Sequence, residues 1–369
     1  MTENFYSDEF YTEEERAQMR EQACASMKKE MRGAYNRVGF AVVLMMGVWL
    51  AQLFFVIGAV TIANRLGVSI FGVSAAEIYN RSLLIINELT LAIAVFAGAV
   101  FLSKLPKAAV ASRSVPFGKF MRVLCMCFAV SYVGNLIGNF LLSLWNSATG
   151  IEVTNELLEV IDGMDPLWLI LCVGIAAPIL EELFFRKLVI DRVRRFGEVP
   201  AMLISALLFA LFHQSATQFL YTFGAGLLLA YFYVRTGNFL WTAVLHAVFN
   251  LVSGVLPTLL IPDILAFAAE IESFVGMGLS ETELAAQMMP VLMEYAGAIM
   301  LYMLYSLVLL IINIIGIVCL FKGIKRFAPN KPEYSLPASE TLRAVFVNPG
   351  MICALILLGA TTVMSLFSV

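Results

Sequence analysis

The sequence predicts an all-α fold: a polytopic bundle of about nine transmembrane helices (eight to nine) with a cytoplasmic N-terminus. Its 369 residues are 60% hydrophobic and only 14% charged, whereas soluble domains carry about 25% charged residues. The mean hydropathy is +0.86. The apolar residues also fall in runs of about 20, the length that crosses a hydrocarbon core of about 30 Å. The bilayer is therefore the expected partner, and the net charge of −3 gives no indication of nucleic-acid binding.

The predicted spans follow from these apolar runs. They lie near residues 39–63, 82–103, 120–145, 166–189, 200–213, 217–235, 238–256, 292–321 and 346–368. One further apolar segment, which begins at Pro257, contains two prolines and several acidic residues. Because proline interrupts helical hydrogen bonding, we expect this segment to be interfacial or re-entrant rather than spanning.

Five regions follow from this division of the chain. We expect a cytoplasmic helical tail, a set of N-terminal spans, a core of four spans, an extracytoplasmic segment, and two C-terminal spans joined by a cytoplasmic linker. Their predicted bounds are 1–38, 39–145, 166–256, 257–291 and 292–369, with the linker at 322–345.

The distribution of lysine and arginine predicts the orientation, because cytoplasmic flanks accumulate positive charge. With the N-terminus inside, the expected outer segments hold two basic residues, Arg65 and Arg81, and the inner ones hold the rest near the span ends. Two outer segments carry acidic residues only: Glu152, Glu156, Glu159, Asp162 and Asp165 in one, and Asp263, Glu270, Glu272, Glu281 and Glu283 in the other. Nine alternating spans fit this pattern.

The fourth predicted span ends in an unusual group of charges. Glu181 and Glu182 close a long apolar run, and Arg186 follows. Glu182 and Arg186 are four residues apart, so they share a helix face and can pair. Glu181 lies about 100° round the helix from Glu182 and is freer to face a cavity. A helix end that extends its charges to the interface is the alternative, but carboxylates gain little from it.

Both histidines of the chain, His213 and His246, lie in the spans that follow. His246 and Asn250 are spaced i and i+4, so both point hydrogen-bond donors in one direction, which suits stabilisation of an oxyanion. A carboxylate beside a histidine, away from bulk water, suits general-base activation of a water molecule. A solitary histidine on a helix is more often a core residue, but ionisable groups inside a bilayer usually mark function.

These motifs, in this order on separate helices, resemble the CPBP family of intramembrane glutamic endopeptidases. The motifs are Glu-Glu-x-x-x-Arg at 181–186, Phe-x-x-x-His at 209–213 and His-x-x-x-Asn at 246–250. The best-known members of the CPBP family are CAAX prenyl proteases, and its bacterial members include bacteriocin self-immunity proteins. The resemblance covers residues 166 to 256, about a quarter of the chain.

The resemblance implies a role for each of the six positions. Glu181 is expected to act as general base with His213 on the attacking water. Glu182 and Arg186 are expected to orient the site, and His246 with Asn250 to bind the oxyanion. The implied substrate is a membrane-associated or lipidated peptide, and the implied location is a bacterial plasma membrane. No cofactor is expected, and a catalytic metal held by the same Glu and His residues is the less favoured interpretation, since no His-Glu-x-x-His is present.

Two other functions stay open at this stage. One is a non-proteolytic scaffold or immunity protein that binds a sensor kinase or a peptide. The other is a proton-coupled transporter, although the two matched halves typical of many transporters are not visible.

The six cysteines are interpreted as packing residues, and the glycines of 224–230 as a close helix contact. We interpret Glu88, Asn135 and Asn139 as makers of helix–helix hydrogen bonds rather than as site residues. The oligomeric state is not predicted.

Overall fold

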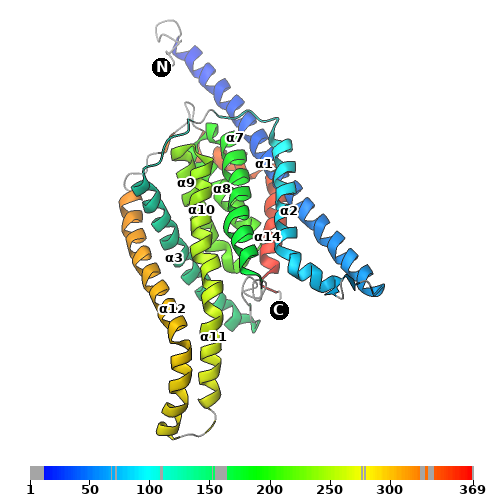
Figure 1. Ribbon diagram of the computed structural model, residues 1–369. Helices are drawn as coiled ribbons and strands as arrows, with labels where there is room; N and C mark the ends of the chain where they lie inside the picture. The colour runs from blue at the N-terminus through cyan, green and yellow to red at the C-terminus, as the bar shows by residue number, and fades with distance from the viewer. Residues whose placement is uncertain are drawn as a thin grey trace.

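The computed structural model is a bundle of helices (Figure 1). It describes residues 12–67, 69–70, 73–108, 111–151, 153, 164–275, 277, 280–324, 329–330 and 336–367. Four acidic residues of the predicted outer segments (Glu152, Glu156, Glu159 and Asp162) and part of the predicted cytoplasmic linker lie outside these described residues.

The N-terminal part consists of three long helices. Helix α1 runs from Glu13 to Arg65, so the predicted tail and the first span form one continuous helix. Thr12 begins it with a capping box: its hydroxyl accepts from the Glu15 N–H at 3.2 Å, and the Glu15 carboxylate accepts from the Thr12 N–H at 2.8 Å. The short antiparallel strands β1 (Ser69–Ile70) and β2 (Val73–Ser74) lead to α2 (Ala75–Leu102) and α3 (Phe117–Thr149).

The fourth span, Pro166–Phe196, alternates between helix types. Its segments are α5 (Pro166–Trp168), η1 (Leu169–Ala176), α6 (Ala177–Glu181), η2 (Glu182–Ile190), α7 (Asp191–Val193) and η3 (Arg194–Phe196). Two of them, η1 and η2, are π-helical. Such widened turns are rare and often occur at functional sites.

The remaining helices complete the bundle. They are α8 (Glu198–Phe212), α9 (Ala216–Thr236), α10 (Phe239–Asn250), the π-helical η4 (Leu251–Val255), α11 (Leu256–Val275), α12 (Glu281–Ile324), α13 (Ala338–Phe346) and α14 (Pro349–Met364). Gly237, at φ 60°, forms the corner between α9 and α10, and the Asn238 side chain caps α10 by accepting from the Trp241 N–H at 3.2 Å.

The predicted fold class is confirmed. Among the described residues, seven helices are long and apolar enough to cross a membrane, or eight if the bent pair α13 and α14 forms one span. Each of the nine predicted spans coincides with a helix, but α8 has only 15 residues and falls short of a spanning length. The orientation of the chain stays a prediction.

The segment that begins at Pro257 is helical, and its interfacial or re-entrant placement stays a prediction. It is the helix α11, with Pro262 inside it, and it continues directly from α10 and η4. Helix α12 packs along it, and Figure 1 shows the pair extending below the rest of the bundle. Contact with a neighbouring helix holds α11 together across the proline, because tertiary packing supplies most helix stability.

Helix α9 lies between α3 and α8 and approaches both closely. A side chain at Gly224 would collide with Val130 of α3, and one at Gly226 would lie 2.8 Å from the ring of Phe209 on α8. These contacts confirm the close packing predicted for residues 224–230. The fourth span lies beside α8, with the rings of Phe184 and Phe185 buried in a core shared with α1 and α14.

Candidate active site

The six predicted site residues come from three neighbouring parts of the bundle. Glu181 is the last residue of α6, and Glu182 and Arg186 follow on η2. His213 comes directly after α8. His246 and Asn250 lie on α10, which packs against α6 and η2.

Glu182 and Arg186 form a buried ion pair, as their spacing predicts. Both side chains are 0% exposed, and Arg186 Nε lies 3.1 Å from Glu182 Oε2. The Arg186 Nε and Glu182 Oε2 atoms are not aligned for a hydrogen bond. Electrostatic attraction between the two charges is therefore the main stabilising interaction of the pair. A buried charge is tolerated only where opposite charges and hydrogen bonds surround it.

Two further contacts hold the Arg186 guanidinium. Its Nη2 donates to the carbonyl oxygen of Gly226 at 3.2 Å, and its central carbon lies 4.4 Å from the centre of the Phe209 ring. A positive charge over an aromatic face is stabilised by the ring quadrupole. The absence of a side chain at position 226 lets α9 approach Phe209, which places that carbonyl beside Arg186.

His246 lies between the two glutamates. Its Nδ1 is 2.9 Å from Glu182 Oε1, and because an ionised carboxylate only accepts hydrogen bonds, this ring nitrogen donates. Its Nε2 faces Glu181 Oε2 at 3.7 Å. Glu181 therefore lies against the free edge of an imidazole whose other edge is fixed by Glu182, an arrangement that orients the ring and selects its tautomer.

The structure brings His213 to the same cluster. Its Nδ1 donates to the Phe209 carbonyl at 2.8 Å, which leaves Nε2 as the acceptor in the neutral ring. The Phe209 ring lies between the two histidines, with its centroid 4.8 Å from that of His213 and 5.6 Å from that of His246. The short α8 ends at Phe212, so His213 follows it directly and lies beside the cluster.

Asn250 lies one turn beyond His246 on α10. Its side-chain nitrogen donates to the carbonyl of Val173 on η1 at 3.1 Å. An amide nitrogen carries two hydrogens, so one donor holds the side chain in place and the other is available to a ligand.

Two residues near the cluster were not assigned to the site from sequence. The Glu88 carboxylate on α2 interacts electrostatically with that of Glu181, and its Oε2 is buried without a hydrogen-bond partner among the described residues. The helix–helix hydrogen bond expected of Glu88 is therefore not made by this oxygen. Cys127 on α3 is fully buried and interacts with the charges of Glu182 and Arg186. For Glu88, the signal was an ionisable residue inside an apolar run.

The acidic and imidazole groups do not form a metal-binding set. Within the described part of the chain, no group of three or more His, Cys, Asp and Glu side chains is placed to hold a metal ion. His246 uses one nitrogen on Glu182, and His213 uses one on a main-chain carbonyl.

The bundle is that of an integral, multi-pass membrane protein, and it contains a buried cluster of carboxylate and imidazole groups. Residues 163–252 match the model of a family described as Rce1-like: type II CAAX prenyl endopeptidase Rce1-like. The match covers about a quarter of the chain and contains all six predicted site residues. It confirms the resemblance to CAAX proteases of the CPBP family and supports a protease activity. Comparisons with curated proteins and with solved structures gave no significant match.

Proposed function

We propose that the chain is an intramembrane endopeptidase that hydrolyses a peptide bond in a membrane-associated or lipidated peptide. The observation that carries this proposal is the Glu181 carboxylate at 3.7 Å from His246 Nε2, where Glu182 and Arg186 orient the ring. A carboxylate and imidazoles that lie together in a buried cluster are groups suited to general acid–base hydrolysis.

In the proposed mechanism, Glu181 is the general base. It accepts a proton from a water molecule as the water oxygen attacks the carbonyl carbon of the substrate. His213 Nε2 is free to accept the second water hydrogen, because Nδ1 is engaged with the Phe209 carbonyl, and so it helps to orient the water. When the tetrahedral intermediate collapses, Glu181 returns its proton to the leaving amine nitrogen, and the C–N bond breaks.

The negative oxygen of the intermediate needs hydrogen-bond donors. His246 supplies one when both ring nitrogens carry hydrogen, since Glu182 accepts the Nδ1 hydrogen and Nε2 points toward Glu181. Asn250 supplies the second through the amide hydrogen that does not bond to Val173. Arg186 holds the Glu182 carboxylate in place, so it positions His246 without contact with the substrate.

The membrane-embedded position of the cluster points to the substrate class. Glu181 is 13% exposed and lies in a span, Pro166–Phe196, whose outward side chains include Leu171, Ile175 and Ile179. A substrate that reaches this cluster must itself be membrane-associated or carry a lipid anchor.

The test uses purified wild type and Glu181→Gln in detergent, with a pool of quenched membrane and lipidated peptides, in the presence and absence of a chelator. We expect wild type to cleave at least one peptide regardless of chelator, and Glu181→Gln to lose about 10²–10⁴-fold in rate. Glu77→Gln is the matched control, because this exposed glutamate pairs with Arg81 far from the cluster. Loss of cleavage with chelator would favour a metal held by the same residues.

A non-proteolytic scaffold or immunity protein is the alternative, and the same variants separate the two. A cellular phenotype that survives both Glu181→Ala and His246→Ala, together with no cleavage by wild type, would contradict the peptidase proposal.

A further inference from the structure

Helix α3 carries a band of uncharged polar residues inside an apolar span. Amide and hydroxyl side chains recur in its last four turns, whereas Phe140, Leu141 and Leu144 on its other side are more than half exposed. The polar residues are Asn135, Asn139, Ser143, Asn146 and Ser147. Within α3, the Asn139 amide nitrogen donates to Asn135 Oδ1 and the Ser147 hydroxyl donates to the Ser143 carbonyl. The donors and acceptors of the band that remain after these bonds are costly in lipid, so we expect them to face water or a polar ligand.

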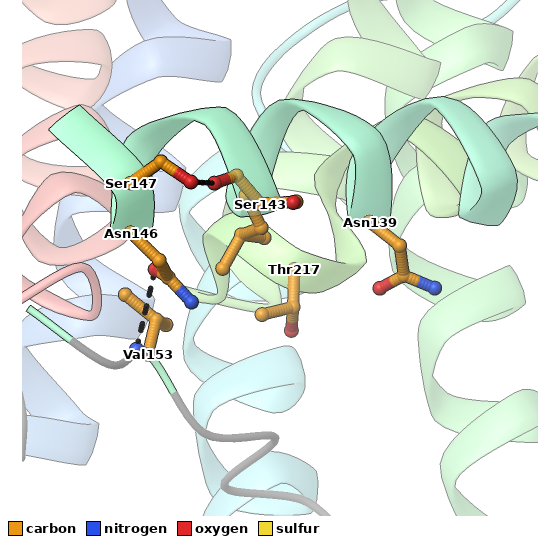
Figure 2. A pocket seen from close by; sticks show the side chains of 7 residues that line it. Asn139, Ser143, Asn146, Ser147, Val153 and Thr217 are labelled. Carbon is orange, nitrogen blue, oxygen red and sulfur yellow. Dashed lines mark hydrogen bonds between the residues drawn. The ribbon is translucent and has the colours of Figure 1, made fainter.

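A cavity of about 340 Å³ opens on this face (Figure 2). Its lining includes Asn139, Ser143, Asn146, Ser147, Val153 and Thr217. The cavity begins where α3 and α9 separate. A side chain at Gly134 would lie 2.8 Å from Tyr221 Cα, and one at Gly138 would lie 3.6 Å from the Thr217 carbonyl. Helix α9 begins at Ala216, so the last turns of α3 extend past its end.

Among the residues that the structure describes, the lining carries hydrogen-bond donors and acceptors but no charged side chain. Such a surface does not favour a phosphate or a metal ion, whereas it matches the alternating N–H and C=O groups of a peptide main chain. Asn146 already contacts main chain in this way. Its side-chain oxygen accepts from the Val153 N–H at 3.4 Å, and after a 180° turn of the amide its nitrogen would donate to the Ile151 carbonyl at 2.9 Å.

The cavity lies close to the candidate active site. Thr217 is four residues after His213, and its hydroxyl is 2.8 Å from that of Ser215 in the turn between them. Along α9, Thr217 is nine residues from Gly226, whose carbonyl binds Arg186. At 1.5 Å per residue, these nine residues span about 14 Å along the axis of α9.

The polar band also continues toward the cluster. Ser131 lies one turn before Asn135 on α3, and its buried hydroxyl has no hydrogen-bond partner among the described residues. One turn earlier, Cys127 lies near Glu182 and Arg186. Helix α3 therefore presents polar groups from the cluster to the cavity.

We propose that this cavity, one wall of which begins four residues after His213, is a subsite for the uncharged polar flank of the peptide substrate. The subsite rests on the proposed peptidase function and adds a requirement to it. A substrate is recognised by the polar segment beside its apolar stretch as well as by the bond that is cleaved.

The test compares peptides that share an apolar stretch of about 20 residues and differ in a six-residue flank, which is Asn/Ser/Thr-rich, basic, acidic or apolar. Binding is measured by fluorescence anisotropy with the Glu181→Gln protein in nanodiscs, and cleavage with the unsubstituted protein. We expect the Asn/Ser/Thr flank to bind about tenfold more tightly than the apolar flank. In the Glu181→Gln variant that also carries Asn139→Leu and Ser143→Val, the ratio of the dissociation constants for the apolar and Asn/Ser/Thr flanks should fall to about one.

Asn80→Leu is the control, since Asn80 is exposed on α2 away from the cavity. A ratio that the cavity substitutions do not change, tightest binding of a charged flank, or no binding of any peptide would overturn the subsite. Cleavage without dependence on the flank rejects the subsite and leaves the peptidase function intact. Flank-dependent binding with no cleavage by the unsubstituted protein supports the subsite and rejects the peptidase function.

Discussion

At the scale of single residues, the cluster depends on one fully buried arginine. Arg186 contacts Glu182, the Gly226 carbonyl and the Phe209 ring. Glu182 in turn fixes His246. Removal of one partner from a buried pair leaves an uncompensated charge, which is far more costly than the loss of an exposed pair.

Replacement of Arg186 by methionine tests this dependence. We expect Arg186→Met to lower the free energy of unfolding by about 3–5 kcal/mol, measured by thermal unfolding in detergent. The control is Arg81→Met, because Arg81 and Glu77 have the same i,i+4 spacing but are 71% and 48% exposed. The control should change stability by less than about 1 kcal/mol. Similar losses for both variants would contradict this account.

The site was predictable from sequence as far as spacing within one helix allows. The Glu182–Arg186 pair follows from a separation of four residues, and the structure confirms it. The contact of Glu181 with His246, and the part that Phe209 and Gly226 play, depend on which helices pack together. Spacing along a chain carries no information about such contacts.

At the scale of helices, the arrangement depends on glycines that let α3, α8 and α9 approach each other. The sequence predicted this for residues 224–230, because small residues at regular spacing are typical of membrane helix contacts. It did not predict the same role for Gly134, since the partner surface belongs to α9. The prolines of α11 likewise report only local hydrogen bonding, and they gave no indication that the segment would form a helix packed against α12.

Alanine substitution at two glycines separates packing from helix propensity. A Cβ at Gly134 would lie 2.8 Å from Tyr221 Cα, whereas nothing lies within 4 Å of one at Gly47 in α1. We expect Gly134→Ala to destabilise the protein by about 1–3 kcal/mol through overpacking. Gly47→Ala should be neutral or stabilise it by up to about 1 kcal/mol, because alanine favours helix. Melting temperatures that shift in the same direction would contradict the packing role of Gly134.

At the scale of the whole molecule, composition predicted the class of fold and the approximate number of helices. The number of spanning helices is harder to predict than the class of fold, because α8 is short and α13 and α14 meet at 72°. Composition measures hydropathy, and it does not measure how far a helix extends or where it bends. The orientation follows only from the lysines and arginines at the span ends.

Cysteine labelling tests the predicted orientation. The six native cysteines are first replaced, and single cysteines are then placed at Asn64 and Ser114, both exposed near helix ends. With the N-terminus inside, an impermeant maleimide should label Asn64→Cys in intact cells. It should label Ser114→Cys only after permeabilisation. The reverse pattern would show that the N-terminus lies outside.

The paired helices α11 and α12 also bear on how this protein is imaged. The 44 residues of α12 correspond to about 66 Å, roughly twice the hydrocarbon core of a bilayer. The hairpin extends below the other helices (Figure 1), so part of it must emerge from a detergent micelle or nanodisc. A 40.6 kDa membrane protein otherwise offers few features for particle alignment in electron cryomicroscopy. This hairpin is a natural position for a rigidly fused fiducial domain or for an antibody fragment.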